Sequence, residues 1–207
     1  MFGPRLPYRY DHYTWLETHH MEFPGTIDIK PRHLEDFGVD VTTSVARHRF
    51  RRILLADGHG SNMPILNIAA RRTVLESDSL CAAFIWPSII SDAAAQIRQS
   101  PRGGMAHACE PETSLYLHLN GEAVQMDKAV PDYSEHKSDF HWQDLQHGSK
   151  IVFMDWWSRI SKTGTVGDPS LATADKGKIV FEAAVTELIR LVREFRAWTG
   201  MPRKDMH

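Results

Sequence analysis

Apolar residues along the first half of the chain are spaced as in alternating helices and strands. Behind Pro31, which suits a first helical turn, they recur at helical intervals to residue 48, at Leu34, Phe37, Val41 and Val45. Two short, continuous apolar runs predict buried strands, at 51–56 and 80–86. Each precedes a stretch that predicts a helix, at about 62–77, with Ser61 or Asn62 as N-cap, and at 88–98. This alternation indicates an α/β fold with a mainly parallel sheet.

The second half of the chain has fewer regular patterns. A Gly-rich loop over 99–106 leads into a predicted helix over 110–119, whose first turn is acidic, as the helix dipole favours. Residues 120–170 are rich in turns, and such long irregular segments often carry function. An amphipathic helix is expected over 175–198. Residues 1–26 show no clean period and are expected to be irregular.

Composition and charge narrow the classes of protein. The chain of 207 residues is 42% hydrophobic and 24% charged, which is typical of one globular domain. A net charge of −2 gives no field that would attract nucleic acid or an anionic membrane, so we expect neither as a partner. One basic cluster leaves nucleic-acid binding open beside the simpler interpretation of a solvated helix end: Arg47, Arg49, Arg51 and Arg52. Without a signal-peptide pattern or a membrane-length apolar run, we expect a cytoplasmic protein.

Cysteine and histidine usage points to the class of chemistry. Two cysteines, Cys81 and Cys109, form neither a disulfide framework nor a CxxC metal motif, which fits a reducing compartment. Twelve histidines are unusual for this length, and histidine is a common metal ligand and proton carrier. Most of them are expected at the surface, so only those in informative surroundings are candidates.

The segment Asp57–Asn62 (Asp-Gly-His-Gly-Ser-Asn) lies where the first predicted strand ends. Ligands of open parallel sheets bind beyond the carboxyl ends of the strands. His59 could therefore bind a metal there, with Asp57 or a backbone carbonyl fixing its tautomer. The glycines on either side, including Gly60, let a ligand approach the backbone closely. The alternative is a plain Gly-rich turn with an exposed histidine.

A second segment, 103–115, places His107, Glu110 and Glu112 within six residues. Imidazole and carboxylate together suit zinc or manganese, and a histidine can accept the proton of a metal-activated water. Because Glu110 and Glu112 are two residues apart, they point to different sides of a helix, and only one is expected to bind a metal directly. The alternatives are a helix start carrying acids for the dipole, or a Cys109 thiol nucleophile beside His107.

A third segment, His19–Thr26, has two adjacent histidines before a Pro-Gly turn, so His20 could line a pocket or lie on an exposed loop.

Together these segments resemble the creatininase (creatinine amidohydrolase) family. Three patches match in the same order. Residues 23–27 resemble its FPGT segment, residues 57–62 its NGHGGN strand end with Asp57 in place of Asn, and residues 104–115 its HAGE-x-ETS-L motif with Cys109 where Gly is usual. With residues 163–169, the likeness spans nearly the whole chain.

The resemblance implies a three-layer α/β/α sandwich with a mainly parallel sheet, a single domain over 1–207, and a homo-oligomer, often a hexamer. It implies a zinc or manganese hydrolase, dinuclear in the family, that acts on cyclic or formyl amides of small molecules. By resemblance His59 and Glu112 are metal ligands and His107 handles protons. The positions beside substrate or behind the ligands are His20, Asp57, Gly60 and Glu110.

The family's first strand carries a Glu, a His and a bridging Asp ahead of the FPGT segment, and no such segment is found here. We therefore expect a chain truncated at its N-terminus relative to the family, with an incomplete dinuclear ligand set. An inactive creatininase-like pseudoenzyme or assembly subunit is the alternative to an enzyme. A weaker one is a small-molecule binding module built on Trp142, Trp156 and Trp157.

Overall fold

The fold is described from a computed structural model that covers residues 13–14, 20–23, 27–136, 138–200, 202–204 and 206. Its contacts divide the chain into two compact units. The strand-pair unit comprises Lys30–Trp86 and Val185–His207, and the network unit comprises Met1–Ile29 and Pro87–Ala184. The long helix α6 (Ala174–Ala197) begins in the network unit and ends in the strand-pair unit. The single domain over 1–207 stays a prediction.

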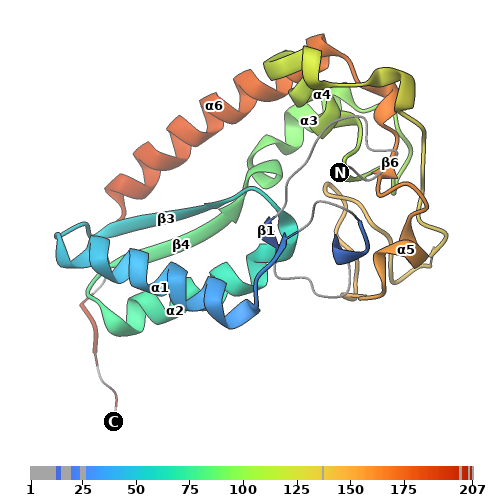
Figure 1. The fold of residues 1–207 in the computed structure, drawn as a ribbon. Helices are drawn as coiled ribbons and strands as arrows, with labels where there is room; N and C mark the ends of the chain where they lie inside the picture. The colour runs from blue at the N-terminus through green and yellow to red at the C-terminus, as the bar shows by residue number, and fades with distance from the viewer. Residues whose placement is uncertain are drawn as a thin grey trace. The chain divides into compact units, whose positions relative to one another are not determined.

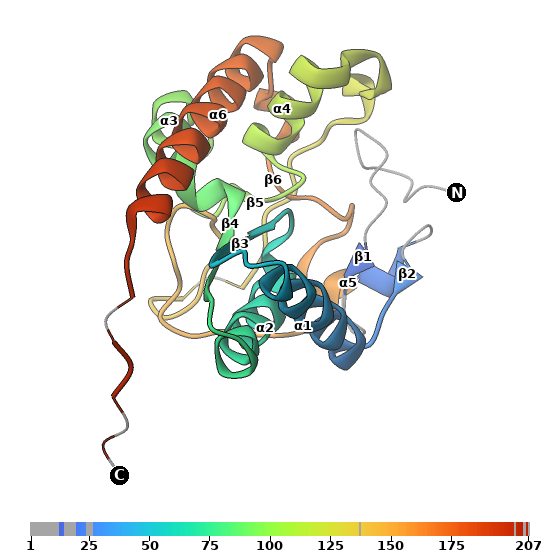
Figure 2. The ribbon, with the colours of Figure 1, turned by 90° about the vertical axis from the view of Figure 1, so that its left-hand side faces the viewer.

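The strand-pair unit is built on two parallel strands. β3 (Arg52–Asp57) pairs with β4 (Leu80–Ile85) in a register that puts Asp57 opposite Ile85. The crossover between them runs through η2 (Gly60–Asn62) and α2 (Met63–Glu76). Figures 1 and 2 place the helix pair α1 (Pro31–Arg47) and α2 on one side of these strands and the second half of α6 on the other.

Small residues let α1 and α2 approach closely. A Cβ added at Gly38 would lie 3.3 Å from the Cβ of Ala69, so the two backbones come together at this point. One turn further along, the buried hydroxyls of Thr42 and Thr73 hydrogen-bond to each other at 2.5 Å. Each hydroxyl is thereby paired where water is excluded. This close packing of α1 on α2 supports β3 and so helps to position the residues at the C-terminal end of that strand.

The network unit has short elements joined by turns. Two strand pairs occur among its described residues: β1 (Tyr13–Thr14) with β2 (Ile27–Asp28) in parallel, and β5 (Met105–His107) with β6 (Val166–Gly167) antiparallel. Its helices among the described residues are α3 (Ser91–Ile97), α4 (Glu110–Asn120), α5 (Trp157–Ile160) and the first half of α6. Short 3₁₀ segments also occur among its described residues, at His20–Glu22, Trp86–Ile90 (which starts in the other unit), Gly121–Ala123, Met126–Lys128 and Pro169–Leu171.

The core of the network unit is small and aromatic. Trp157, Ile160 and Val166 form its buried centre, with Phe23 packed against them. The Trp157 indole N–H donates to the carbonyl of Gly164 at 3.0 Å, so the buried ring leaves no polar atom unpaired. Gly164 has a φ of +91°, which favours glycine, and a Cβ there would lie 3.3 Å from the Phe23 ring.

Carboxylates hold the irregular segment 120–170 in place. Oδ2 of Asp132 accepts hydrogen bonds from the hydroxyls of Ser161 and Thr163, at 3.0 and 2.8 Å, and from the backbone of residues 162 and 163, both at 2.8 Å. This single oxygen fixes the turn that leads into β6. The segment thus has a defined course although it contains little regular structure.

The α/β fold predicted from the sequence is confirmed, and the ends of α1, α2, α4, α6, β3 and β4 fall within about two residues of the predicted ones. Two details were wrong. Residues 105–106 belong to strand β5, not to a loop, and residues 86–90 form a 3₁₀ turn ahead of the shorter helix α3. No helix of the described residues is long and apolar enough to cross a membrane.

Candidate functional site

The first candidate cluster lies at the C-terminal end of β3. Asp57 is only 5% exposed, and its Oδ1 accepts a hydrogen bond from the backbone N–H of His59 at 3.1 Å. Its Oδ2 is buried and has no hydrogen-bond partner among the described residues. Burial raises the pKa of Asp57 and outweighs the hydrogen bonds from His59 and Asn62 that lower it. An unsatisfied carboxylate oxygen in such a place is costly, and a cation or an N–H donor would offset that cost.

His59 sits in extended conformation directly before η2. Burial lowers the pKa of its imidazole to about 4, so the ring is neutral at pH 7. Neutral imidazole is the form that binds metals. The two flanking glycines differ: a Cβ at Gly60 would lie 3.3 Å from Cδ1 of Ile85, whereas one at Gly58 would meet nothing within 4 Å. Gly60 therefore lets the turn pack on the end of β4, and Gly58 leaves open space beside the histidine.

The second candidate cluster lies at the turn from β5 into α4. His107 is buried, and its ring meets the Trp157 ring edge to face, with centroids 5.1 Å apart. The next residue, Ala108, has a φ of +48°, in the left-handed region that residues with a Cβ avoid at a cost of roughly 1–2 kcal/mol. The chain reverses there, and α4 begins two residues later. Strained backbone of this kind gathers at functional sites.

Glu112 is the acid of this turn whose pKa is shifted. Its side chain is partly buried, and burial raises its pKa to about 7, against hydrogen bonds at Ala108 and Cys109 that lower it. Sγ of Cys109 lies 3.7 Å from Oε2 of Glu112. Burial, with the charge of Glu112, raises the pKa of the Cys109 thiol well above its ordinary value. The thiol stays protonated at neutral pH, which argues against Cys109 as a nucleophile.

Glu110 is fully buried and saturated by protein donors. Its carboxylate accepts from the backbone N–H groups of Gln99 and Ser100, with distances of 3.1 Å, and pairs with Nζ of Lys176. Lys176 also donates to the carbonyl of Leu171 at 2.7 Å. These contacts tie the start of α4 to the end of α3 and the start of α6. Glu110 thus supports the turn that carries His107 and Glu112.

The predicted site residues fall into both units. His107, Glu110 and Glu112 share one turn of the network unit, while Asp57, His59 and Gly60 share one turn of the strand-pair unit. The joint position of His59 and Glu112 stays a prediction. His20 begins the first 3₁₀ turn, and its side chain lies outside the part of the chain that is described. No three His, Cys, Asp or Glu side chains of the described residues are gathered as metal ligands.

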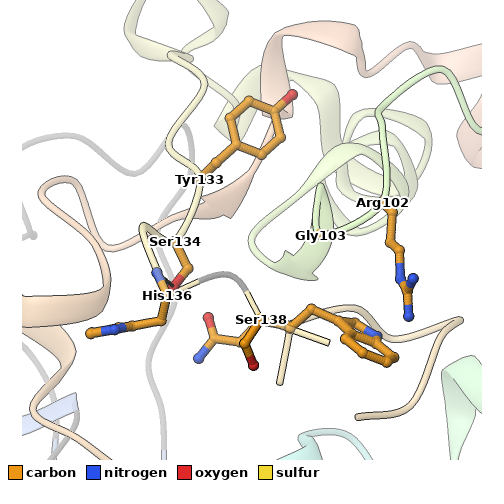
Figure 3. Close-up of a pocket in the computed structure, with 8 residues that line it drawn as sticks. Arg102, Gly103, Tyr133, Ser134, His136 and Ser138 are labelled. Carbon is orange, nitrogen blue, oxygen red and sulfur yellow. Dashed lines mark hydrogen bonds between the residues drawn. The ribbon is translucent and has the colours of Figure 1, made fainter. Parts of the chain in front are cut away.

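The sequence did not predict a small pocket beside the 101–104 loop. Its lining includes Arg102, Ser134, His136, Trp142 and Gln143, and Figure 3 shows several of them around one hollow. Of these lining residues, the sequence had pointed only to Trp142, because the tryptophans of the irregular segment 120–170 suggested a binding site for a small molecule. The structure separates those tryptophans: Trp142 lines the pocket, Trp157 is core, and Trp156 is 42% exposed.

Comparison with known proteins places these turns in a family context. The family model described as creatininase, creatinine amidohydrolase, matches residues 4–192. The mycofactocin precursor peptide peptidase of Mycobacterium tuberculosis is 28% identical over 191 residues, which cover 90% of this chain and 63% of that protein. The 3-dehydro-scyllo-inosose hydrolase of Thermotoga maritima is 26% identical over 200 residues, with 88% and 62% covered. The chain thus spans less than two thirds of the length of these relatives.

Solved structures agree on the fold. A substituted creatininase of the Zn-Zn type and a manganese creatininase superpose with TM-scores of 0.69, at 22% and 23% identity. In each case 83% of this chain and 67% of the other are covered. Solved creatininases therefore occur in zinc and manganese forms.

Proposed function

Because this chain belongs to the creatininase family, we propose that it is a metal-dependent hydrolase acting on an amide-type C–N bond of a small molecule. The substrate class we propose is a cyclic amide or a formamide. One observation carries the proposal: the turn from β5 into α4 carries both His107 and Glu112, a carboxyl group whose pKa burial raises to about 7. Titratable groups with shifted pKa values and a strained backbone together favour catalysis over a plain helix start.

The donor groups of both turns fit a divalent cation. We propose His59 and Glu112 as metal ligands. Neutral imidazole and carboxylate suit zinc and manganese, and Oδ2 of Asp57 is a buried oxygen without a partner among the described residues. A cation held there would polarise the scissile carbonyl and acidify water. Asp57, through its contact with the His59 backbone, would position that histidine.

His107 is proposed to move the proton. Its ring is buried edge-on against Trp157, which fixes its plane, and the left-handed Ala108 sets the direction of the turn behind it. An oriented imidazole can accept the proton of the attacking water and return it to the leaving nitrogen. The ion pair between Glu110 and Lys176 supports the turn that carries His107, so we propose these two as positioning residues.

The experiment is a metal analysis and an activity assay of the purified protein. We expect zinc or manganese to copurify or to bind on addition, and the loaded protein to hydrolyse a panel of cyclic amides and formamides. His107→Gln should lower kcat by about 100-fold or more while metal content is unchanged. A protein that neither contains nor binds either metal would contradict the proposal. Metal binding without hydrolysis of any panel member would support the pseudoenzyme alternative.

We further propose a homo-oligomer, hexameric by resemblance. The second half of α6 exposes an apolar stripe whose members are each 41–47% exposed: Val185, Leu188, Ile189 and Val192. Exposed apolar surface of this kind marks association sites. Light scattering should show an oligomer for the native chain and a smaller species for Leu188→Glu, whereas Glu187→Lys on the same helix should assemble normally. A monomeric native chain would contradict this part.

A further inference from the structure

The His107 imidazole packs on the Trp157 indole, and a hydrogen bond to a neighbouring turn holds that indole. The Trp157 N–H donates to the carbonyl of Gly164 at 3.0 Å, within the buried core of the network unit. The rings of His107 and Trp157 meet edge to face, with centroids 5.1 Å apart. A displacement of the Gly164 carbonyl would therefore move the indole, and with it the surface on which the imidazole rests.

The turn that contains Gly164 covers residues 161–165 and is held by its own hydroxyl groups. The side chains of Ser161 and Thr163 are buried. Oγ of Ser161 accepts from the backbone N–H of Gly164 at 2.8 Å, and Oγ1 of Thr163 accepts from that of Thr165 at 3.2 Å. A hydroxyl that accepts such a bond must direct its own proton elsewhere. The turn therefore needs an acceptor for two hydroxyl protons.

Asp132 is that acceptor. Its Oδ2 accepts from the hydroxyls of Ser161 and Thr163, at 3.0 and 2.8 Å. The same oxygen also accepts from the backbone N–H groups of residues 162 and 163, both at 2.8 Å. Hydrogen bonds to a charged acceptor are roughly twice as strong as those between neutral groups. One carboxylate oxygen thus orients both hydroxyls and the backbone of the turn.

The backbone of Asp132 provides a second link toward His107. Its N–H donates to the carbonyl of Gly167 at 2.9 Å, and the N–H of Gly167 donates to the carbonyl of Asp132 at 2.7 Å. In the preceding position of β6, Val166 pairs with His107. A Cβ on Gly167 would collide with the carbonyl oxygen of Gly104, so β6 packs directly on backbone just ahead of β5. Asp132 is therefore bonded to both structures that flank His107.

We propose that Asp132 is a positioning residue for His107, which acts through the turn 161–165 and the Trp157 indole. His107 is the proton carrier of the proposed function, on which this inference rests. Four donors occupy Oδ2 of Asp132, so the carboxylate serves to hold one orientation of the imidazole and not to carry a proton itself.

The first measurement uses the metal-free full chain and needs no substrate. In ¹H–¹³C NMR spectra, the imidazole signals of His107 are assigned by their loss in His107→Gln. Asp132→Asn removes the charge that strengthens the four hydrogen bonds, so these signals should move by more than those of His33 and His48, which lie in the other unit. A loss of overall stability does not move the signals of molecules that remain folded.

Ser161→Ala is the milder variant, because it removes one of the four donors and the acceptor of the Gly164 N–H while Asp132 keeps its charge. It should move the His107 signals in the same direction as Asp132→Asn, by a smaller amount. If Asp132→Asn does not fold, this variant decides the question.

Kinetics provide the second measurement, on the zinc- or manganese-loaded chain. Asp132→Asn should lower kcat by about tenfold, because a displaced base transfers protons poorly, while KM and metal content stay native. Trp157→Phe keeps an aromatic ring but removes the bond to Gly164, and it should have a similar effect. The two substitutions together should lower kcat by less than the product of their separate effects, since both act through one route.

Ser138→Ala is the matched control. Oγ of Ser138 also accepts two backbone N–H groups of segment 120–170, those of Phe140 and His141, at 3.1 and 2.9 Å. Its His107 signals and kcat should be native. The proposal is overturned if neither Asp132→Asn nor Ser161→Ala moves the His107 signals, if the control moves them equally, or if Asp132→Asn keeps native kcat. A chain without any hydrolytic activity would contradict the proposed function, and the NMR spectra would still show whether Asp132 orients His107.

Discussion

The two strand-to-helix turns that carry the candidate chemistry are built in different ways. The turn after β3 follows a six-residue parallel ladder, and the helices behind it pack through Gly38, Ala69 and paired threonines. The turn after β5 follows three strand residues with an irregular register, and a buried ion pair between Glu110 and Lys176 holds it. Regular packing positions the first turn, and a polar network positions the second.

Burial shifts the pKa values of the two proposed metal ligands in opposite directions. In the turn after β3 it lowers the pKa of His59 to about 4, and in the turn after β5 it raises the pKa of Glu112 to about 7. Both groups are thereby kept neutral in the metal-free protein near pH 6. Neutral imidazole is already the form that binds a metal, and a cation bound beside Glu112 would favour its carboxylate form.

The largest expected effect comes from breaking the network of the second turn. Lys176→Met leaves the carboxylate of Glu110 buried without its cation, so the free energy of unfolding should fall by about 3–5 kcal/mol in urea titrations. Lys178→Met, which removes an exposed pair with Glu182 on the same helix, should cost less than about 0.5 kcal/mol. Equal losses in the two variants would show that the network does not hold the turn.

The next largest effect is on how the free energy of unfolding depends on pH, which His59 and Glu112 should change in opposite directions. For His59, a folded pKa below its ordinary 6.5 means that stability is present above pH 6.5 and is lost as pH falls toward 4. For Glu112, a folded pKa above its ordinary 4.5 means that stability is present below pH 4.5 and is lost as pH rises through 7.

Single substitutions should therefore change the slope with opposite signs. In metal-free protein, Glu112→Gln should make stability rise more steeply between about pH 4.5 and 6.5, and His59→Gln should make it fall with pH over the same window. The change approaches about 1.4 kcal/mol per pH unit. Denaturant midpoints at several pH values measure it, with Glu122→Gln as an exposed control. If stability depends on pH in both variants as it does in the native chain, the opposite effects expected of His59 and Glu112 are contradicted.

The smallest effect concerns the backbone of the second turn. Ala108→Gly relieves the left-handed residue at φ +48° and should change stability by no more than about 1 kcal/mol in the stabilising direction. Ala106→Gly, in the neighbouring strand, should instead destabilise by about 0.5–1 kcal/mol. Thermal unfolding of both variants compares them, and the same sign in both would argue against strain at residue 108.

The contrast between regular packing and a polar network also explains which elements could be predicted from the sequence. Helical spacing of apolar residues predicted α1 and α6, and continuous apolar runs predicted β3 and β4, because the burial of these elements depends on neighbours in regular positions. Strand β5 has three residues behind two glycines, too few to show alternation, so it was taken as loop. Its stability comes from pairing with β6, about sixty residues later.

Among the candidate residues, motif resemblance located both turns. It could not give Glu110 its partners, since Lys176 lies 66 positions away in the chain. The pocket was missed for a similar reason. Arg102 and Gln143 carry no motif, and contacts between distant segments, such as those of Asp144 with Arg98 and Gly103, bring them together.

The central claim is that His59 and Glu112 are metal ligands, and zinc affinity tests it most directly. Calorimetric titration of the metal-free chain should give tight binding that His59→Ala and Glu112→Gln each weaken by about tenfold or more, while the exposed controls His48→Ala and Glu122→Gln bind as the native chain does. If both ligand variants retain native affinity for zinc and for manganese, the account is contradicted.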